Sequence, residues 1–255
     1  MKNKAIILGD AVNSTHTIEL YKKNKKTSIL EKLNKKSMLK ANEIDSCYNA
    51  PIDLSWVPFA TGHYNISPDL NDYIVVRIPA LTSEIPNRNM AAFPTSVLFA
   101  FDPEYSRLRY QTFIGRPICR EHNNKNLKES QGIIVDASIV PVPSYKVVKV
   151  MLLALIDRTK CSEINTILRG KASYSMGCLN GSFTCSYCFK TLGPEVQRTC
   201  TCYHTDYTNM SSYGGIYNGR LHFLYANNPI YGECSLVNAP ADISAVGDMI
   251  GSLLK

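Results

Sequence analysis

Three segments of the chain carry side chains that together could perform nucleophilic catalysis. His122 follows a Gly/Pro turn that begins at Gly115, and Ser175 stands just ahead of Gly177 in a short apolar segment. Glu233 lies in a third segment, closer to the C-terminus. A serine hydroxyl is a weak nucleophile until a base removes its proton, histidine is the usual base near neutral pH, and a carboxylate can orient it. These residue types raise the hypothesis of a serine protease.

A second group of chemically active side chains is rich in cysteine. Five of the nine cysteines fall close together, which in a reducing compartment indicates a metal site rather than a disulfide framework. A Cys-x-x-Cys turn at Cys185 and Cys188 places two thiolates on one metal, and structural zinc takes four N/S ligands. His204 with either Cys202 or Cys200 would complete the set. We therefore predict a structural zinc, with a loop of free thiols as the alternative.

The elements that must position these residues are mainly strands. Short runs rich in Val and Ile, bounded by Gly, Pro and polar residues, predict strands, and the nearly continuous apolar run over 146–157 is typical of a strand buried on both faces. The predicted strands cover residues 72–80, 132–137, 146–157, 172–179, 221–225 and 232–237. Helices are predicted over 162–168 and 242–254. The expected fold class is α+β, mostly β, with a few helices around a mixed sheet.

Changes in composition and hydrophobic periodicity divide the chain into four parts. Residues 1–45 are rich in Lys, Asn and Ser and are expected to form a basic N-terminal arm or a propeptide. Residues 46–180 would form the first part of the core. Residues 181–219 have no hydrophobic periodicity and are interpreted as an inserted loop that binds the zinc. Residues 220–255 would supply the last core strands and a C-terminal helix.

The net charge of +7 is local. Eight lysines between Lys22 and Lys40, opposed by Glu31 alone, carry all of it, so the rest of the chain is neutral. A neutral body argues against a nucleic-acid-binding domain. No apolar run approaches the roughly 20 residues that a membrane-spanning helix needs, and Gly9-Asp10 ends the first apolar run too early for a signal peptide. We expect a cytosolic protein without a membrane partner.

Several blocks of the sequence, in this order, resemble the prohead (capsid maturation) proteases of tailed bacteriophages, which share a fold with herpesvirus assemblin. The resemblance covers roughly residues 70–245. The matching blocks are Ile85-Pro86-Asn87-Arg88-Asn89, Tyr110-Gln111-Thr112-Phe113-Ile114-Gly115-Arg116-Pro117, Glu121-His122-Asn123-Asn124, Gly132-Ile133-Ile134-Val135-Asp136-Ala137, Tyr174-Ser175-Met176-Gly177-Cys178, and Ser235-Leu236-Val237 with Pro240-Ala241. The Cys/His insert is similar to one in a large-phage branch of the family, which favours Cys202 over Cys200.

The resemblance implies a barrel-like fold and a serine endopeptidase with His122 as general base and Ser175 as nucleophile. It implies either Glu233 or His222 as the third catalytic residue, because assemblin uses a second histidine and the phage relatives use an acid. The implied substrates are the phage scaffold or core proteins, the major capsid protein and the protease itself. The implied location is the immature head in the host cytoplasm, and a homo-oligomer is expected.

A second class of function stays open. A non-enzymatic head-assembly or zinc-dependent binding protein would have the same fold and the same zinc insert. The presence of both Ser175 and His122 favours the enzyme, since a protein that has lost protease activity has no reason to keep both.

Overall fold

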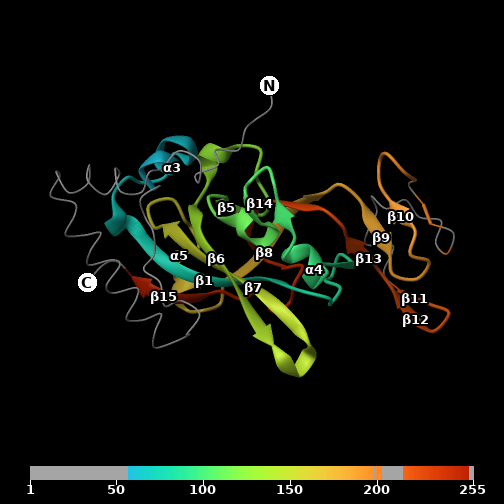
Figure 1. Cartoon of the computed structure of the whole chain (residues 1–255). Coiled ribbons are helices and arrows are strands. Elements are labelled where there is room, and N and C mark those ends of the chain that lie inside the picture. The colour runs from blue at the N-terminus through green and yellow to red at the C-terminus, as the bar shows by residue number, and fades with distance from the viewer. Residues whose placement is uncertain (1–56, 198, 201, 203–214, 253–255) are drawn as a thin grey trace.

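The computed structural model of the chain describes residues 57–197, 199, 200, 202 and 215–252. The predicted basic arm, residues 1–45, lies outside these ranges. The described part is mostly β, with few helices and one large sheet that curls into a half-barrel (Figure 1), which confirms the predicted mostly β class. Within the described part, every helix is too short or too polar to cross a membrane.

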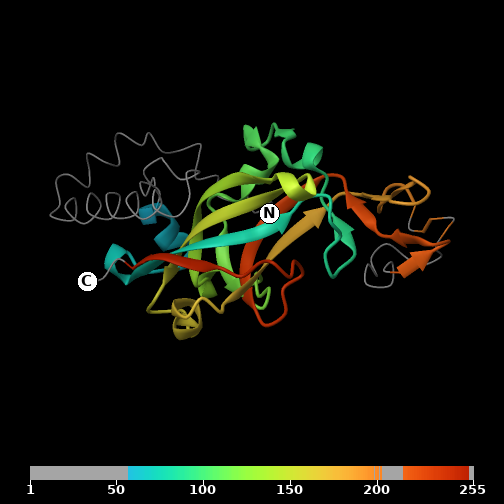
Figure 2. The ribbon, with the colours of Figure 1, turned by 90° about the horizontal axis from the view of Figure 1, so that it is seen from below.

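Seven strands form the large sheet. In order across it they are β15 (Asp248–Ser252), β1 (Tyr73–Thr82), β7 (Val147–Asp157), β6 (Gly132–Val142), β5 (Pro117–Arg120), β14 (Pro229–Val237) and β8 (Ser173–Asn180). Neighbours are antiparallel, except that β5 and β14 are parallel. The sheet is therefore mixed, and Figure 2 shows it from below.

Strand β7 is buried on both faces, as its continuous apolar sequence predicts. Leu152 and Ala154 face one hydrophobic cluster, and Leu153 and Leu155 face another. The first cluster also contains side chains of β1 and β8, which lie far apart in the order of strands, so it fills the concave side of the curled sheet. The second cluster is covered by helix α3 (Val57–Tyr64) and the 3₁₀ helix η2 (Leu70–Asp72).

The predicted C-terminal helix over 242–254 is wrong for the described residues. Residues 248–252 form β15, which pairs with β1. The segment just before it bonds to the start of β8, with Tyr174 N donating to Ala245 O at 2.8 Å and Gly247 N donating to Ala172 O at 3.0 Å. These distant pairings override the local helical pattern. The C-terminal segment thus links the two sides of the curled sheet.

The described part of the predicted insert contributes β9 (Phe183–Cys185) and β10 (Thr191–Leu192) to a small second sheet and β11 (Gly215–Tyr217) to a hairpin beside it. The four strands of this sheet, in order, are β10, β9, β13 (Leu224–Ala226) and β2 (Ala91–Ala92), and the hairpin consists of β11 and β12 (Arg220–His222). This unit projects from one end of the large sheet (Figure 1). β12 and β13 also belong to the small unit, and the large sheet resumes at Pro229.

Short elements connect the strands. They are α4 (Thr95–Leu98), β3 (Phe101–Asp102), β4 (Arg107–Leu108), η3 (Arg109–Phe113), η4 (Leu127–Glu129), η5 (Pro143–Tyr145) and α5 (Ile164–Leu168). The predicted helix over 162–168 corresponds to α5.

Candidate functional site

The loop after β5 holds His122 in an uncommon backbone conformation. Glu121 and His122 have φ angles of 46° and 58°, in the left-handed region that side chains other than glycine rarely adopt. Two hydrogen bonds to β14 fix the loop: Glu121 N donates to Leu236 O at 2.9 Å, and His122 N donates to Ser235 Oγ at 3.2 Å. Strained backbone of this kind is often found at functional sites.

A buried carboxylate orients the imidazole. Glu233, on β14, is fully buried, and its Oε1 lies 2.8 Å from Nδ1 of His122. Its Oε2 accepts a hydrogen bond from Ser235 Oγ at 2.5 Å. The side chain of His122 is 44% exposed, so its ring reaches solvent while its Nδ1 is held from inside. Ser235 bonds both to the carboxylate and to the backbone of the histidine loop, and therefore ties these two parts of the site together.

The same carboxylate changes the acid–base behaviour of the histidine. The hydrogen bond with Glu233 is the largest cause of a raised pKa of His122, partial burial opposes it, and the charges of Glu233 and Glu121 add to it. The charged form is favoured because the paired carboxylate is close and itself shielded from water. An imidazolium formed during a reaction would be stabilised at this position.

Strand β8 brings Ser175 to the same face as this pair. Ser175 lies directly across from Ser235, and Gly177 lies directly across from Glu233. Opposite residues of antiparallel strands, and residues two apart on one strand, share a face of the sheet. Ser175 is buried, and among the described residues no hydrogen bond joins its Oγ to His122.

Gly177 explains how the carboxylate fits. A Cβ atom added at this position would lie 1.9 Å from Oε1 of Glu233 and 2.8 Å from its Cδ. The side chain of Glu233 therefore crosses the backbone of Gly177 on its way to His122. The glycine that follows the candidate nucleophile makes room for the candidate acid.

The structure brings the predicted His122 and Glu233 together and places Ser175 on the adjoining strand. The alternative third residue, His222, lies elsewhere, with its Nε2 3.0 Å from Sγ of Cys185. Sequence reasoning missed Ser235 as a contact of this site. The signal was present, because in a strand the side chain two residues after Glu233 points the same way.

Cys119, on β5, lies directly opposite Ser235 of β14 and offers a thiol near the carboxylate of Glu233. Burial, with a contribution from the charge of Glu233, raises the pKa of Cys119 to about 12. A thiol with such a pKa stays protonated near neutral pH and is a poor nucleophile. The serine is therefore the better candidate nucleophile on this face. A small polar hollow of about 130 Å³ lies alongside, lined in part by Glu121, Ser173 and Val237.

The small unit gathers a second group of chemically active side chains. Ligand atoms of Cys185, Cys200, Cys202 and His222 all lie within 4.8 Å of one another. The Sγ atom of Cys202 is 3.4 Å from that of Cys185 and 3.2 Å from that of Cys200, and Nε2 of His222 is 3.6 Å from it. This group could bind a metal ion. Cys185 ends β9 and His222 ends β12, so both come from strands of the small unit.

The metal group differs in part from the predicted one. Cys185 and Cys202 are present as predicted, and the alternatives Cys200 and Cys202 are both included rather than one of them. His222 supplies the nitrogen, whereas the predicted His204 lies outside the described residues. The predicted ligand Cys188 is not one of the four.

Cys188 lies immediately beside the group. Its backbone N donates to Sγ of Cys185 at 3.4 Å. Burial raises the pKa of Cys188, but hydrogen bonds from the Lys190 backbone and the neighbouring thiols outweigh burial and lower it to about 7. The cluster therefore has a fourth sulfur, that of Cys188, next to the three sulfurs and one nitrogen of its closest members.

The geometry of the four closest members is compatible with zinc. Zinc–sulfur bonds of about 2.3 Å in a tetrahedron place sulfur atoms about 3.8 Å apart. The observed sulfur separations of 3.2 and 3.4 Å are slightly shorter. A small outward movement of each thiol would make room for an ion at the centre.

No protein-family model, no curated protein and no solved structure matches this chain. The function must therefore be inferred from the ordered sequence blocks described above and from the geometry of these two groups of side chains.

Proposed function

We propose that this protein is a serine endopeptidase with Ser175 as nucleophile, His122 as general base and Glu233 as the residue that orients the base. The observation that carries the proposal is the 2.8 Å contact between Nδ1 of His122 and the buried carboxylate of Glu233, on the face of the sheet that also holds Ser175. A histidine with one ring nitrogen held by a carboxylate and the other directed elsewhere is the arrangement that activates a serine.

The chemistry would be acyl transfer. Nε2 of His122 takes the proton of Ser175 Oγ while Oγ attacks the peptide carbonyl carbon, and Glu233 stabilises the imidazolium that forms. The carbon–nitrogen bond then breaks, and the imidazolium protonates the leaving amine. Water attacks the acyl-serine, its proton passes to His122, and the carboxylic acid product leaves with Ser175 restored. The hydrogen bond between nucleophile and base often forms fully only when substrate binds. The lack of a hydrogen bond between Ser175 and His122 among the described residues is therefore compatible with this route.

The proposed setting is phage head maturation, because the ordered blocks resemble the prohead proteases. The substrates would then be scaffold or core proteins, the major capsid protein and the protease itself, inside the immature head in the host cytoplasm. The mixed, curled, mostly β sheet is compatible with an assemblin-like fold. The resemblance also supports a homo-oligomer.

We also propose that the cysteine cluster holds a structural zinc ion through Cys185, Cys200, Cys202 and His222. Three thiolates and one imidazole match the ligands and number that structural zinc prefers. Four protein ligands leave no open position for a substrate, so the ion would stabilise the small unit rather than catalyse a reaction.

Intact mass over time tests the protease directly. Wild type, Ser175→Ala and His122→Ala are incubated at high concentration, alone and with a phage scaffold protein. Ser173→Ala, on the same strand, is the matched control. We expect processing by wild type and by the control only. Normal processing by Ser175→Ala would remove the serine from the mechanism.

The non-enzymatic alternative has one observation in its favour, namely that Ser175 is buried and not hydrogen bonded to His122 among the described residues. A serine-reactive phosphonate separates the two functions. Labelling at Ser175 that depends on His122 supports the protease. A chain that is neither labelled nor processed, with or without scaffold, would be an assembly or binding protein.

A further inference from the structure

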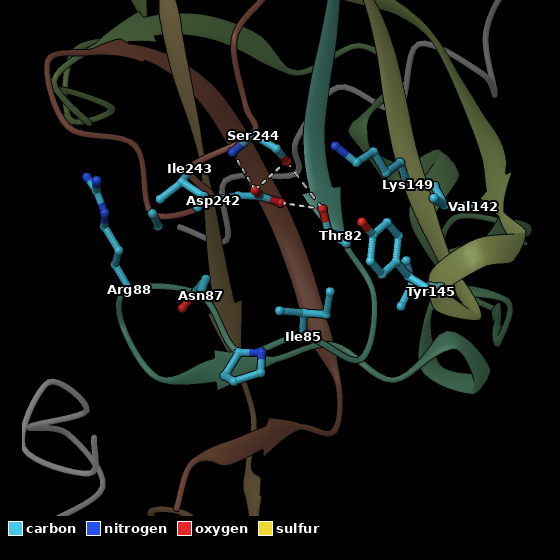
Figure 3. Close-up of a pocket in the computed structure, with 13 residues that line it drawn as sticks. Thr82, Ile85, Asn87, Arg88, Val142, Tyr145, Lys149, Asp242, Ile243 and Ser244 are labelled. Carbon is cyan, nitrogen blue, oxygen red and sulfur yellow. Dashed lines mark hydrogen bonds between the residues drawn. The ribbon is translucent and has the colours of Figure 1, made fainter. Parts of the chain in front are cut away.

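A second cleft, of about 750 Å³, opens at the end of β1 and is not part of the proposed catalytic site. Its walls come from four places: Thr82 at the end of β1, the loop after it, the β6–β7 hairpin, and residues 241–244 (Figure 3). None of the three proposed catalytic residues lines it. Clefts of a few hundred Å³ or more with apolar walls are the usual places where proteins bind ligands.

Large apolar side chains surround this cleft yet remain in contact with solvent. Ile85, Tyr145 and Ile243 come from three separate segments and are 48%, 74% and 71% exposed. Figure 3 shows them on three sides of the cleft. Apolar side chains gathered in one exposed place mark a binding surface more often than scattered ones do.

The charges at the cleft are unbalanced. Both carboxylate oxygens of Asp242 are already engaged: Oδ2 accepts from Thr82 Oγ1 at 2.7 Å, and Oδ1 accepts from the backbone N and the Oγ of Ser244 at 2.9 and 2.6 Å. Lys149 and Arg88 also line the cleft, and neither forms an ion pair of 4 Å or less within the described ranges. Nη1 of Arg88 donates to Pro240 O at 3.3 Å, and the charge of Lys149 interacts with that of Asp242. The cleft thus carries two cations and one carboxylate, and this net positive charge favours an acidic ligand.

The openness of the cleft favours a peptide over a compact small molecule. A site for a small molecule encloses most of its ligand, whereas Ile85, Tyr145 and Ile243 are 48%, 74% and 71% exposed. An extended peptide can lie across such an open surface and place alternate side chains in the cleft.

We propose that this cleft docks an extended segment of a partner protein, with apolar side chains between Ile85, Tyr145 and Ile243 and acidic side chains that reach Lys149 on one side of the cleft and Arg88 on the other (Figure 3). The inference does not depend on proteolysis. It predicts that the nucleophile is irrelevant to binding, so failure of this proposal and failure of the proposed protease are distinguishable.

Fluorescence anisotropy of the full chain carrying Ser175→Ala provides the test, with a labelled peptide of alternating leucine and glutamate as the probe. We expect saturable binding that weakens at least tenfold in two double variants, Tyr145→Ser with Ile243→Ser and Lys149→Gln with Arg88→Gln. The matched controls are Ile216→Ser, which removes an equally exposed apolar side chain on β11, and Lys146→Gln, in the same hairpin but not on the cleft wall. Both controls should bind normally.

The charge and the occupant are tested separately. The same peptide with glutamine in place of glutamate should bind at least tenfold more weakly to the intact cleft. Absence of saturable binding up to about 1 mM, or equal binding by the cleft variants and the controls, would overturn the proposal. A concentration-dependent dimer that disappears in the Tyr145→Ser, Ile243→Ser variant would also overturn it, because the occupant would then be a second copy of the chain.

Discussion

The missing side chain at Gly177 is what allows Glu233 to reach His122. A methyl group at this position would lie 1.9 Å from the carboxylate oxygen of Glu233, which is fully buried, so the carboxylate would have to move. We expect Gly177→Ala to displace Glu233 from His122, to bring the pKa of His122 back toward its ordinary value, and to lower kcat/KM roughly 10- to 100-fold. Proteolytic rates and NMR titration of the imidazole measure both effects.

The matched control is Gly232→Ala, on the facing strand. A Cβ at Gly232 would meet only Gly177 O, at 3.8 Å, which is an ordinary contact. This variant should keep both the activity and the raised pKa. An unchanged pKa of His122 in Gly177→Ala would show that the carboxylate adapts and that the glycine has no role in the site.

The raised pKa of His122 predicts a pH dependence with a definite sign. A general base must be neutral, so kcat/KM should fall as pH decreases through a pKa above the ordinary value of 6.5. Glu233→Gln should move this acid limb to lower pH and reduce kcat roughly 100-fold or more, because the amide stabilises the imidazolium less. Glu121→Gln removes only a weaker contribution and should shift the limb less.

The free energy of unfolding should also depend on the protonation of His122, but it should decrease with rising pH where the activity increases. A histidine whose pKa is raised by folding contributes stability that is fully present below the unfolded pKa and lost as pH rises through the folded pKa. Urea denaturation of wild type and Glu233→Gln at several pH values measures this difference. The difference in unfolding free energy between wild type and Glu233→Gln should shrink as the pH rises through the folded-state pKa of His122. A difference that grows instead would contradict the raised pKa.

At the scale of elements, the proposed zinc would add stability to the small unit. Its strands are two or three residues long, and it is joined to the rest of the chain through the β13–β2 pairing and through Phe183, Leu192 and Leu224, which belong to the main hydrophobic cluster. A bound metal stabilises short strands of this kind by holding their ligands together. We expect His222→Asn to lower the bound zinc and to increase hydrogen exchange in β9 and β13, with β6 and β7 unaffected.

A second variant, Cys188→Ser, distinguishes the observed ligand set from the set predicted from sequence. The four closest ligand atoms exclude Cys188, so its loss should leave zinc content near that of the wild type. Zinc retained by His222→Asn but lost in Cys188→Ser would favour the set predicted from sequence, with His204 as the nitrogen ligand. Elemental analysis of the purified variants gives the answer.

The elements that were predicted well are those whose sequence alone explains them. β7 is apolar on both faces because both of its faces are covered. A helix would also fit its run over 146–157, but the Val content and the flanks favour the strand that is observed. Residues 248–252 were expected to be helical and instead form β15, because their partner strand β1 is distant in sequence. β12 and β13 pair with β11 and β9 of the predicted insert, and these pairings are likewise invisible in any local sequence pattern.

The candidate site, like the strands, could be predicted only where information beyond the local sequence was available. His122 and Glu233 are 111 residues apart and came together in the prediction through the ordered blocks of the family resemblance, not through any local pattern. The role of His222 was missed because its position beside Cys185 depends on how β11 and β12 fold back. The role of Ser235 becomes visible only when β14 is paired with β8 and β5, and no single segment of the sequence reveals these pairings.

At the scale of the whole molecule, the segment before β15 holds the two sides of the curled sheet together. Gly247 makes this possible, because a Cβ there would lie 2.4 Å from Cε2 of the Tyr174 ring. The ring is fully buried in the concave cluster, so it cannot move aside. We expect Gly247→Ala to destabilise the protein by about 1–3 kcal/mol through this overpacking, measured by urea denaturation.

Two further variants separate this clash from a general loss of flexibility. Tyr174→Phe keeps the ring and removes only a buried hydroxyl without a hydrogen-bond partner, so it should be nearly neutral and should leave the cost of Gly247→Ala unchanged. Tyr174→Leu removes the ring edge, so the cost of Gly247→Ala measured in that background should fall by half or more. Because β8 carries Ser175, opening this contact should also reduce proteolysis. Equal costs in both backgrounds would mean that the glycine acts through the unfolded chain and that the sheet is not closed by this contact.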